Sequence, residues 1–349
     1  MEGLVLEYRD PLFGIVIFFS LIFCISFLTY SFGAYKERKA RLEYRKLLKR
    51  FELGKLKEED YVHLYKTYNL PFDSIILLAS SFLHKGDYTK AISVYLALLE
   101  HVTNRVKKEE LLELLGTTYY KGGFLQRSKD IFLKILKFSP RNTNALQYLL
   151  LIYEKLKDFD RAFEVLESLD ELQVDISKDK IYIKTLRVIN DPLLSYEKKT
   201  QALNTLFENN KIIERLFAQY LIMFNKTFLW ENIERFEVNK FTDLMWYQKF
   251  EDIDFDKVSN NSFLEQLYNA KSYLNTLKHS KDFDFDILIL LNTHEHDTKA
   301  DLDFEFICTS CKHVHPIFES RCPHCHCILS FNVKHMLIKN SYEKNQSLL

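Results

Sequence analysis

Three stretches of the chain share one pattern of residue spacings, and this pattern constrains the fold more than any other feature. They span residues 77–99, 114–136 and 149–169. In each stretch a small or apolar residue is followed three residues later by an aromatic residue and twelve residues later by a small residue. Such offsets suit two antiparallel helices that approach closely at the small residues and enclose the aromatic ring. The sequence therefore predicts stacked helical hairpins.

The period of this pattern is 37 residues from Ala79 to Gly116 and 34 residues from Gly116 to Leu150, and it resembles that of the tetratricopeptide repeat. Pro140 stands where the second helix of the middle repeat should end. Generic amphipathic hairpins are the alternative, although they require only a period of about 3.6 residues and not this spacing. We expect an array without chemistry of its own, whose first helices form a concave face for a peptide or a partner helix. Seven residues fall towards that face in the register of the repeat, and each is equally consistent with an ordinary solvated residue: Glu110, Glu113, Thr117, Tyr120, Asn144, Gln147 and Glu154.

Composition supports a helical chain and gives no case for a nucleic-acid partner. Only 8 Gly and 6 Pro occur among 349 residues, while hydrophobic residues make up 47%, which is typical of a mostly helical protein with short connections. The 48 basic residues are balanced by 48 acidic residues, so the chain lacks the basic footprint of a nucleic-acid binder. Helical periodicity continues through residues 171–303 without the repeat signature, and we interpret this part as degenerate helical hairpins that extend the array.

Two short segments near the end of that part are ambiguous. Residues 282–291 begin with strict alternation and then become continuously apolar, so a strand and a helix both stay open. The acids Asp282, Asp284 and Asp286 lack the central glycine and the final glutamate of an EF-hand, and we expect a polar edge rather than a calcium loop. Residues 294–297 are His-Glu-His-Asp, without the histidine spacing of a zinc protease, and a solvated linker is favoured over a second metal site.

An uncharged stretch of 21 residues, Leu12–Phe32, lies near the start of the sequence. At about 1.5 Å per helical residue it spans a hydrocarbon core of about 30 Å. The charged residues before it are three acids, Glu2, Glu7 and Asp10, and one base, Arg9, whereas a cleaved signal peptide has a positive start and a shorter apolar core, so we expect a membrane anchor. Eight basic residues follow closely: Lys36, Arg38, Lys39, Arg41, Arg45, Lys46, Lys49 and Arg50. Under the positive-inside rule they predict that residues 36–349 lie in the cytoplasm.

Five of the six cysteines lie between Cys308 and Cys327. Four of them form two C-x-x-C pairs separated by ten residues, and they are the predicted metal ligands: Cys308, Cys311, Cys322 and Cys325. Two such turns can point four sulfurs at one ion, which favours a closed, structural tetrathiolate site for Zn²⁺ or a single iron. A thioredoxin-like redox pair is the alternative, but neither pair stands in a βαβ pattern. Cys327 and four nearby histidines, one of which could replace a cysteine, are expected to be peripheral: His313, His315, His324 and His326.

The combination of an anchor, a basic flank, helical repeats and the terminal pairs CTSC and CPHC resembles lipopolysaccharide assembly protein B, a family of bacterial inner-membrane proteins. The most similar stretches are residues 114–136 and 144–169. The resemblance implies a C-terminal rubredoxin-type zinc domain that packs on the repeats, with the four paired cysteines as ligands. Such knuckles usually carry Gly after the second cysteine of each pair, where a left-handed backbone is needed. This chain has Lys312 and His326 there, so its turns are expected to be strained or differently shaped.

The resemblance also implies a function, that of a non-enzymatic adaptor with no catalytic residue. It would couple a membrane AAA protease to turnover of the deacetylase that commits precursors to lipid A, and would thereby regulate lipopolysaccharide supply. The expected partners are that protease, other lipopolysaccharide-assembly proteins and the inner membrane. A homodimer is a further option, and nucleic acid is not expected. The alternatives are a membrane-tethered, rubredoxin-like electron carrier with iron, a tetratricopeptide scaffold for another membrane complex, and a zinc-ribbon nucleic-acid binder whose affinity falls with salt.

The predicted fold class is all-α, with an N-terminal transmembrane helix, a tetratricopeptide-type α-solenoid and a small C-terminal rubredoxin-like zinc-knuckle domain. The expected boundaries follow in chain order: a transmembrane anchor at 1–35, a basic juxtamembrane helical linker at 36–70, tetratricopeptide repeats at 71–170, degenerate helical repeats at 171–303, the zinc-binding domain at 304–334 and a tail at 335–349.

Overall fold

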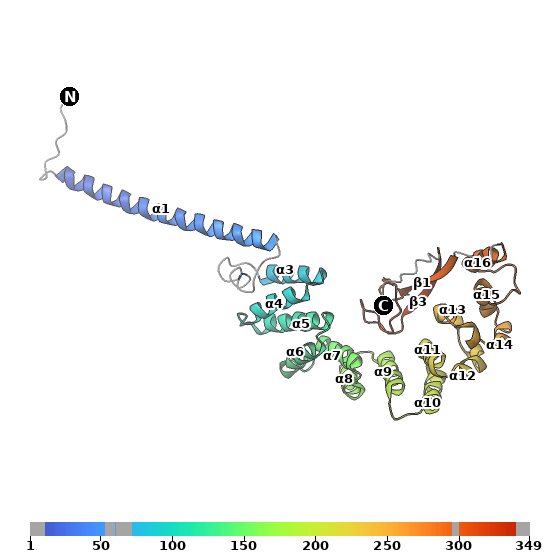
Figure 1. Cartoon of the computed structure of the whole chain (residues 1–349). Coiled ribbons are helices and arrows are strands. Elements are labelled where there is room, and N and C mark those ends of the chain that lie inside the picture. Colours follow the sequence, from blue (N-terminus) through green and yellow to red (C-terminus); the bar gives the residue numbers. More distant parts are fainter. Residues whose placement is uncertain (1–10, 53–59, 61–71, 295–299, 340–349) are drawn as a thin grey trace, which may run out of the picture. The chain divides into compact units, whose positions relative to one another are not determined.

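The computed structural model describes residues 11–52, 60, 72–294 and 300–339. They belong to two compact units, Met1–Phe138 and Ser139–Leu349, and each unit is described by itself. Helices up to α6 lie in the first unit, and helices α7 to α16 with strands β1 to β3 lie in the second (Figure 1). The described chain is a run of helices in tandem that ends in a small sheet, which confirms the predicted fold class.

Helix α1 (Pro11–Glu52) is 42 residues long. Its segment Ile17–Lys36 has a mean hydropathy of 1.9 and no buried part. The exposed side chains include Phe18, Phe23 and Phe27, and an apolar surface that is exposed on all sides of a helix suits lipid better than water. By length and composition this segment can cross a membrane, and it overlaps the predicted span.

After helix α1, the described residues of the first unit form two helical hairpins. Helix α3 (Phe72–His84) packs against α4 (Tyr88–Leu99), and α5 (Arg105–Lys121) packs against α6 (Leu125–Phe138). In the first hairpin the small residues of the repeat are fully buried where the two helices meet, which is the role that the spacing predicts for them: Ala79 and Ala91.

The second hairpin shows why the repeat requires a small residue at this position. A Cβ atom added to Gly116 would lie 2.8 Å from the ring of Phe132, which is buried between the helices. The hydroxyl of Ser128 donates a hydrogen bond of 2.8 Å to the carbonyl of Gly116. The close approach is therefore fixed by packing and by one buried polar contact.

The third hairpin, α7 (Thr143–Leu156) and α8 (Phe159–Glu171), opens the second unit and reproduces the turn of the other two. Each turn contains one left-handed residue at the same place in the repeat, with φ of 78° at Gly86, 79° at Gly123 and 57° at Lys157. Glycine adopts this conformation without steric cost, and a lysine does not. The third repeat thus keeps its turn geometry despite its sequence.

The helices after α10 are shorter, and the shortest are α12 to α14. The bounds of the helices from α9 to α15 are α9 Ser177–Asn190, α10 Tyr196–Asn209, α11 Glu214–Phe224, α12 Lys226–Glu231, α13 Thr242–Trp246, α14 Phe255–Ser259 and α15 Ser262–Ala270. Four short 3₁₀ segments lie between them: η1 Lys211–Ile213, η2 Ile233–Arg235, η3 Val238–Phe241 and η4 Phe250–Asp252.

The ambiguous segment 282–291 is helical. Helix α16 (Phe283–His294) begins directly after Asp282, whose carboxylate accepts hydrogen bonds from the backbone N–H groups of Asp284 and Phe285 at 3.1 and 3.2 Å. This acid therefore acts as a helix cap, and the apparent alternation at the start is capping chemistry rather than a strand. The motif at residues 294–297 lies outside the described residues, apart from the backbone of His294.

The sheet has three antiparallel strands in the order β2-β1-β3. Strand β1 (Ala300–Cys308) pairs along its whole length with β3 (Phe331–Lys339), and β2 (Val314–His315) is short. The two long strands run beyond residues 304–334, the segment expected for the zinc domain. They carry the cysteine loops at one end of the sheet.

The helices and the sheet of the second unit share one hydrophobic core. The buried side chains Leu302, Phe304 and Phe306 alternate along β1 and pack in one cluster with Met245 and Phe285 of the helices. The sheet is therefore a wall of the helical core rather than a separate domain with a core of its own.

Candidate metal centre

The four paired cysteines converge at the end of the sheet. Each offers one sulfur, and these four Sγ atoms all lie within 4.8 Å of one another. The Sγ atoms of Cys308 and Cys325 are 3.6 Å apart, and those of Cys311 and Cys322 are 3.7 Å apart. A tetrahedron with Zn–S bonds of about 2.3 Å has edges of about 3.8 Å. The spacing of the sulfurs therefore fits a single tetrahedral metal ion.

Both loops hold their sulfurs with the same set of backbone hydrogen bonds. The first sulfur of each pair accepts two N–H groups, from Ser310 and Cys311 onto Cys308 and from His324 and Cys325 onto Cys322. The second sulfur of each pair accepts the N–H group found two residues further on. N–H groups that point at sulfur stabilise the thiolate form, which is the form that binds metal.

Each loop is closed by a left-handed residue after its second cysteine. Lys312 and His326 both have φ of 61°. Their N–H groups bond back to the carbonyls of Cys308 and Cys322, each at 2.9 Å. The loops thus keep the shape expected of glycine-containing knuckles, and each non-glycine residue adds about 1 kcal/mol of strain. Of the two expectations, strain is the correct one.

Ionisation of the thiols is uneven. Burial raises the pKa of Cys308, but hydrogen bonds from the Ser330 hydroxyl and from the amides of Cys311 and Ser310 outweigh burial and bring that pKa down to about 6. Burial raises the pKa of Cys322 to about 12 despite its own amide hydrogen bonds. Sulfurs this close cannot all become anions without a cation between them. The four-thiol donor set is therefore compatible with a bound metal such as zinc, which would neutralise the shared charge.

Cys327 and the neighbouring histidines surround the four sulfurs, and one ring nitrogen each of His313 and His324 lies within 4.8 Å of the Cys311 sulfur. The rings of His313 and His324 stack at 3.6 Å on the exposed side, and His315 places its Nε2 atom 3.6 Å from the sulfur of Cys322. The backbone N–H of Cys327 bonds to the sulfur of Cys325, so this residue contributes through its backbone. The peripheral role of these residues stays a prediction, because His313 and His324 are close enough to Cys311 to share a metal ion with it.

Arg321, which sequence reasoning missed, ties the second cysteine loop to the helices. Its guanidinium donates to Glu154 of α7 at 2.8 Å, to Asp179 of α9 at 3.0 Å and to the carbonyl of His326 at 2.9 Å. The Arg321 side chain is 11% exposed and that of Glu154 is 12% exposed, so these charges are largely withdrawn from water. Burial lowers the pKa of Arg321, but the two carboxylates outweigh burial and raise it, which keeps the guanidinium charged. The one sequence signal is that Arg321 directly precedes Cys322 and is the only arginine after Arg235.

The residues predicted for the concave face divide between the two units. Glu110, Glu113, Thr117 and Tyr120 lie on α5 of the first unit, and the other three lie on α7 of the second. Of these three, Asn144 and Gln147 line a cavity of about 550 Å³ together with Arg321, Cys325 and Cys327. Glu154 also accepts a hydrogen bond from the hydroxyl of Tyr182 at 3.0 Å. Binding of a partner along this face stays a prediction.

The group of potential metal ligands that lies away from the cysteines is explained by other contacts. Asp282, Asp284 and His335 approach one another, and Nε2 of His335 lies 3.1 Å from both carboxylate oxygens of Asp282. The ring of His335 also stacks on Phe285 at 4.9 Å. Since Asp282 caps α16 as well, this group links α16 to β3 and gives no case for a second metal.

Comparison with known proteins agrees with the resemblance seen in the sequence. No protein-family model matches the chain. The chain is 24% identical over 157 residues to lipopolysaccharide assembly protein B of Escherichia coli, both in strain K12 and in O157:H7. The match covers 44% of this chain and 39% of each relative, so the chain spans about two fifths of the length of the curated relatives it matches. The chain is thus similar, over less than half of its length, to proteins named for lipopolysaccharide assembly.

Proposed function

We propose that this protein is a membrane-anchored, non-enzymatic adaptor that regulates lipopolysaccharide biosynthesis. The observation that carries the proposal is the closed four-cysteine cluster at the end of the helical array. Four sulfurs at tetrahedral spacing would complete the shell of a metal ion and leave no position for a substrate, so the site is structural. The names of the similar proteins supply the process, lipopolysaccharide assembly.

The proposed mechanism is scaffolding at the membrane. Helix α1 spans the inner membrane, and the basic residues after it hold the remainder of the chain on the cytoplasmic side. Confinement to the membrane raises the effective concentration of membrane-bound partners. The partners proposed are the membrane AAA protease and, through it, the deacetylase of the lipid A pathway. Residues of the concave face would contact them, and no residue of this chain is catalytic.

The proposed metal is Zn²⁺, bound by Cys308, Cys311, Cys322 and Cys325. Zinc suits a closed tetrathiolate site that needs no redox chemistry. The same sulfur geometry accepts a single iron, which would favour a membrane-tethered electron carrier. Elemental analysis of the purified full-length protein distinguishes the two functions: about one zinc per chain supports the adaptor, whereas a red, iron-loaded protein with a reversible one-electron couple contradicts it.

Cell experiments test the function directly. In cells that lack the protein, the amount of the deacetylase should change, and the wild-type chain should restore it. Pull-down from detergent-solubilised membranes, with mass spectrometry, should recover the protease. A reporter fused after Leu349 should be active only in the cytoplasm. A deacetylase level that is the same with and without the protein would contradict the proposed role, and a periplasmic reporter would contradict the topology.

A further inference from the structure

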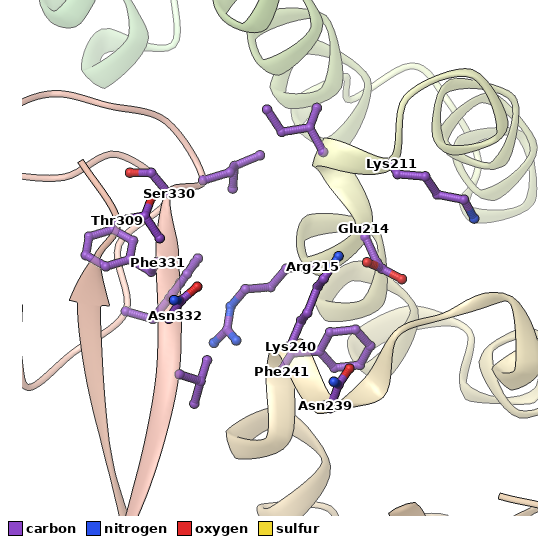
Figure 2. Close-up of a pocket in the computed structure, with 14 residues that line it drawn as sticks. Lys211, Glu214, Arg215, Asn239, Lys240, Phe241, Thr309, Ser330, Phe331 and Asn332 are labelled. Carbon is purple, nitrogen blue, oxygen red and sulfur yellow. The ribbon is translucent and has the colours of Figure 1, made fainter.

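A second cavity of about 580 Å³ lies in the second unit and shares Thr309 and Ser330 with the cavity beside α7. One wall is the start of β3, with Phe331, Asn332 and Val333. The opposite wall comes from α11 and from η3, the short segment before α13. Figure 2 shows Arg215 projecting from the helical wall towards Phe331 and Asn332.

The free edge of the sheet opens into this cavity. The strand order β2-β1-β3 leaves the outer side of β3 without a neighbouring strand. The N–H of Thr309 bonds to the carbonyl of Ser330 at 2.6 Å. This bond shows which residue pairs of β1 and β3 are hydrogen-bonded and which are not. The backbone groups of Asn332 therefore face β1, and those of Phe331 and Val333 face outwards. Within the described ranges, no hydrogen bond is formed by these outward-facing groups.

This part of the edge carries no residue that blocks pairing. Natural edge strands are blocked by Lys, by Pro, by a bulge or by a covering segment. Further along β3 such cover exists, because α16 packs against the strand and Asp282 holds His335. At Phe331–Val333 the residues are Phe, Asn and Val, and although β3 also contacts η3 and α13, the cavity is lined by these three residues on one side and by η3 on the other.

The cavity has the size of a short strand. A residue in a packed sheet occupies about 3.3 Å along the strand, about 4.8 Å between strands and about 10 Å between layers, or about 160 Å³. A volume of about 580 Å³ therefore holds a segment of about four residues. Apolar side chains line much of the wall, including Phe241, Phe318 and Val333, and suit apolar side chains of an added strand.

The charge of the lining favours an acidic segment. Of its four ionisable side chains, three are basic: Lys211, Arg215 and Lys240. The one acid, Glu214, is buried and accepts the N–H of Glu237 at 2.6 Å, and burial raises its pKa. Arg215 binds Asp243 through both terminal nitrogens and stacks 3.7 Å over Phe318, and its buried Nε has no hydrogen-bond partner among the described residues. Lys240 pairs at the rim with Glu237 at 2.9 Å, but the two side chains are 57% and 60% exposed, and so exposed a pair is weak enough for Lys240 to change partner.

We propose that this cavity is a strand-addition site, in which an extended segment of another protein pairs with Phe331 and Val333 of β3 and places an acidic side chain among the basic residues. Main-chain hydrogen bonds to the edge give affinity, and the apolar wall with its cations selects apolar and acidic side chains at alternate positions. The site does not depend on a role in lipopolysaccharide biosynthesis, and none of the residues predicted for the concave face lines it.

The test uses the full-length protein in detergent and a fluorescent peptide, acetyl-Val-Asp-Val-Glu-Val-Asp-Val-amide, whose binding is followed by anisotropy. Val333→Pro removes one outward-facing N–H but leaves the ladder with β1 intact, and it should weaken binding at least about tenfold. Lys240→Glu should weaken binding by a similar factor, whereas Lys249→Glu, an exposed lysine outside the lining, should leave binding unchanged.

Peptide controls keep the test independent of how the variants fold. Two peptides are compared, N-methylated either at the odd-numbered or at the even-numbered amides. Only one of these two sets of amides faces β3, so only one of the two peptides should lose binding. Replacing the acids of the peptide by lysine should also abolish it. Failure of the acidic peptide to bind, or equal binding of both N-methylated forms, overturns the proposal. Binding of decanoate with no binding of peptide would assign the cavity to a small amphiphile and likewise overturn it.

Discussion

The hairpins of residues 72–171 and the sheet with its cysteine loops are ordered by different means. Each hairpin is held by its own packing, as at Gly116 and Phe132, and depends on its immediate neighbours. The cysteine loops have little apolar surface of their own and depend on four sulfurs and on Arg321, whose partners lie more than a hundred residues away in the chain. Order in the hairpins is therefore local, and order at the sheet is conditional on a metal and on distant contacts.

Loss of the metal should cause the largest difference in stability between the hairpins and the sheet. We expect Cys322→Ser to abolish stoichiometric metal binding and to remove a contribution on the order of 10 kcal/mol. Hydrogen exchange should then rise throughout residues 300–339 and in α11 to α16, because these elements share a core. Protection in α3 to α6 should be retained. Cys327→Ser is the matched control and should keep both metal and protection, and collapse of α3 to α6 in the Cys322 variant would contradict local order in the hairpins.

Removal of Arg321 tests the distant contacts with the cysteines left in place. Arg321→Ala leaves Glu154 and Asp179 facing each other without a cation, and breaking a buried ion pair in this way costs about 3–5 kcal/mol. We expect a lower free energy of unfolding for the second unit, faster exchange in α7 and α9, and continued metal binding at saturating zinc.

Arg321→Lys, which keeps the charge but loses the forked geometry, should lie between wild type and Arg321→Ala. If Arg321→Ala had the same free energy of unfolding as the wild type, the contact of Arg321 with the helices would contribute nothing to stability.

A change inside a hairpin should have a smaller and local effect. Gly116→Ala introduces a Cβ against the Phe132 ring, where overpacking costs about 1–3 kcal/mol, and the helix propensity gained offsets about 1 kcal/mol. Exchange should accelerate in α5 and α6 only, and metal content should stay at the wild-type value. Gly33→Ala, where an added Cβ meets no atom within 4 Å, serves as the control. A reduced metal content in Gly116→Ala would show that the regions are coupled.

The smallest effect is expected from relief of strain in the cysteine loops. Lys312→Gly and His326→Gly place glycine at φ of 61° and should stabilise the metal-bound form by up to about 1 kcal/mol each. Metal affinity, measured by competition with a chelator, should rise for both variants. A lower affinity would mean that the side chains of Lys312 and His326 contribute more than their backbone strain costs.

The sequence was sufficient to predict those parts of the structure that depend on residues close together in the chain. The hairpin spacing and the two C-x-x-C pairs predicted helices that are present and sulfurs that converge, because both follow from geometry within a few turns of chain. The secondary structure of segment 282–291 could not be predicted from its hydrophobic period, because the interaction that favours a helix is the cap at Asp282. The contact of Arg321 with Glu154 was beyond prediction, because no local pattern reports a pair 167 residues apart.

The Arg321 contact also has a consequence for the order in which the chain acquires its structure during synthesis. Chains grow from the N-terminus, and domains generally fold as they emerge. Glu154 and Asp179 are made long before Arg321, so they remain two acids without this counterion until Arg321, 142 residues after Asp179, has left the ribosome. The contact of Arg321 with these two acids is therefore among the last to form, and Arg321 lies directly beside a metal-binding cysteine. A truncated or metal-starved chain would retain an unneutralised acidic pair on its helices, a feature by which quality-control proteases could distinguish it from the finished protein.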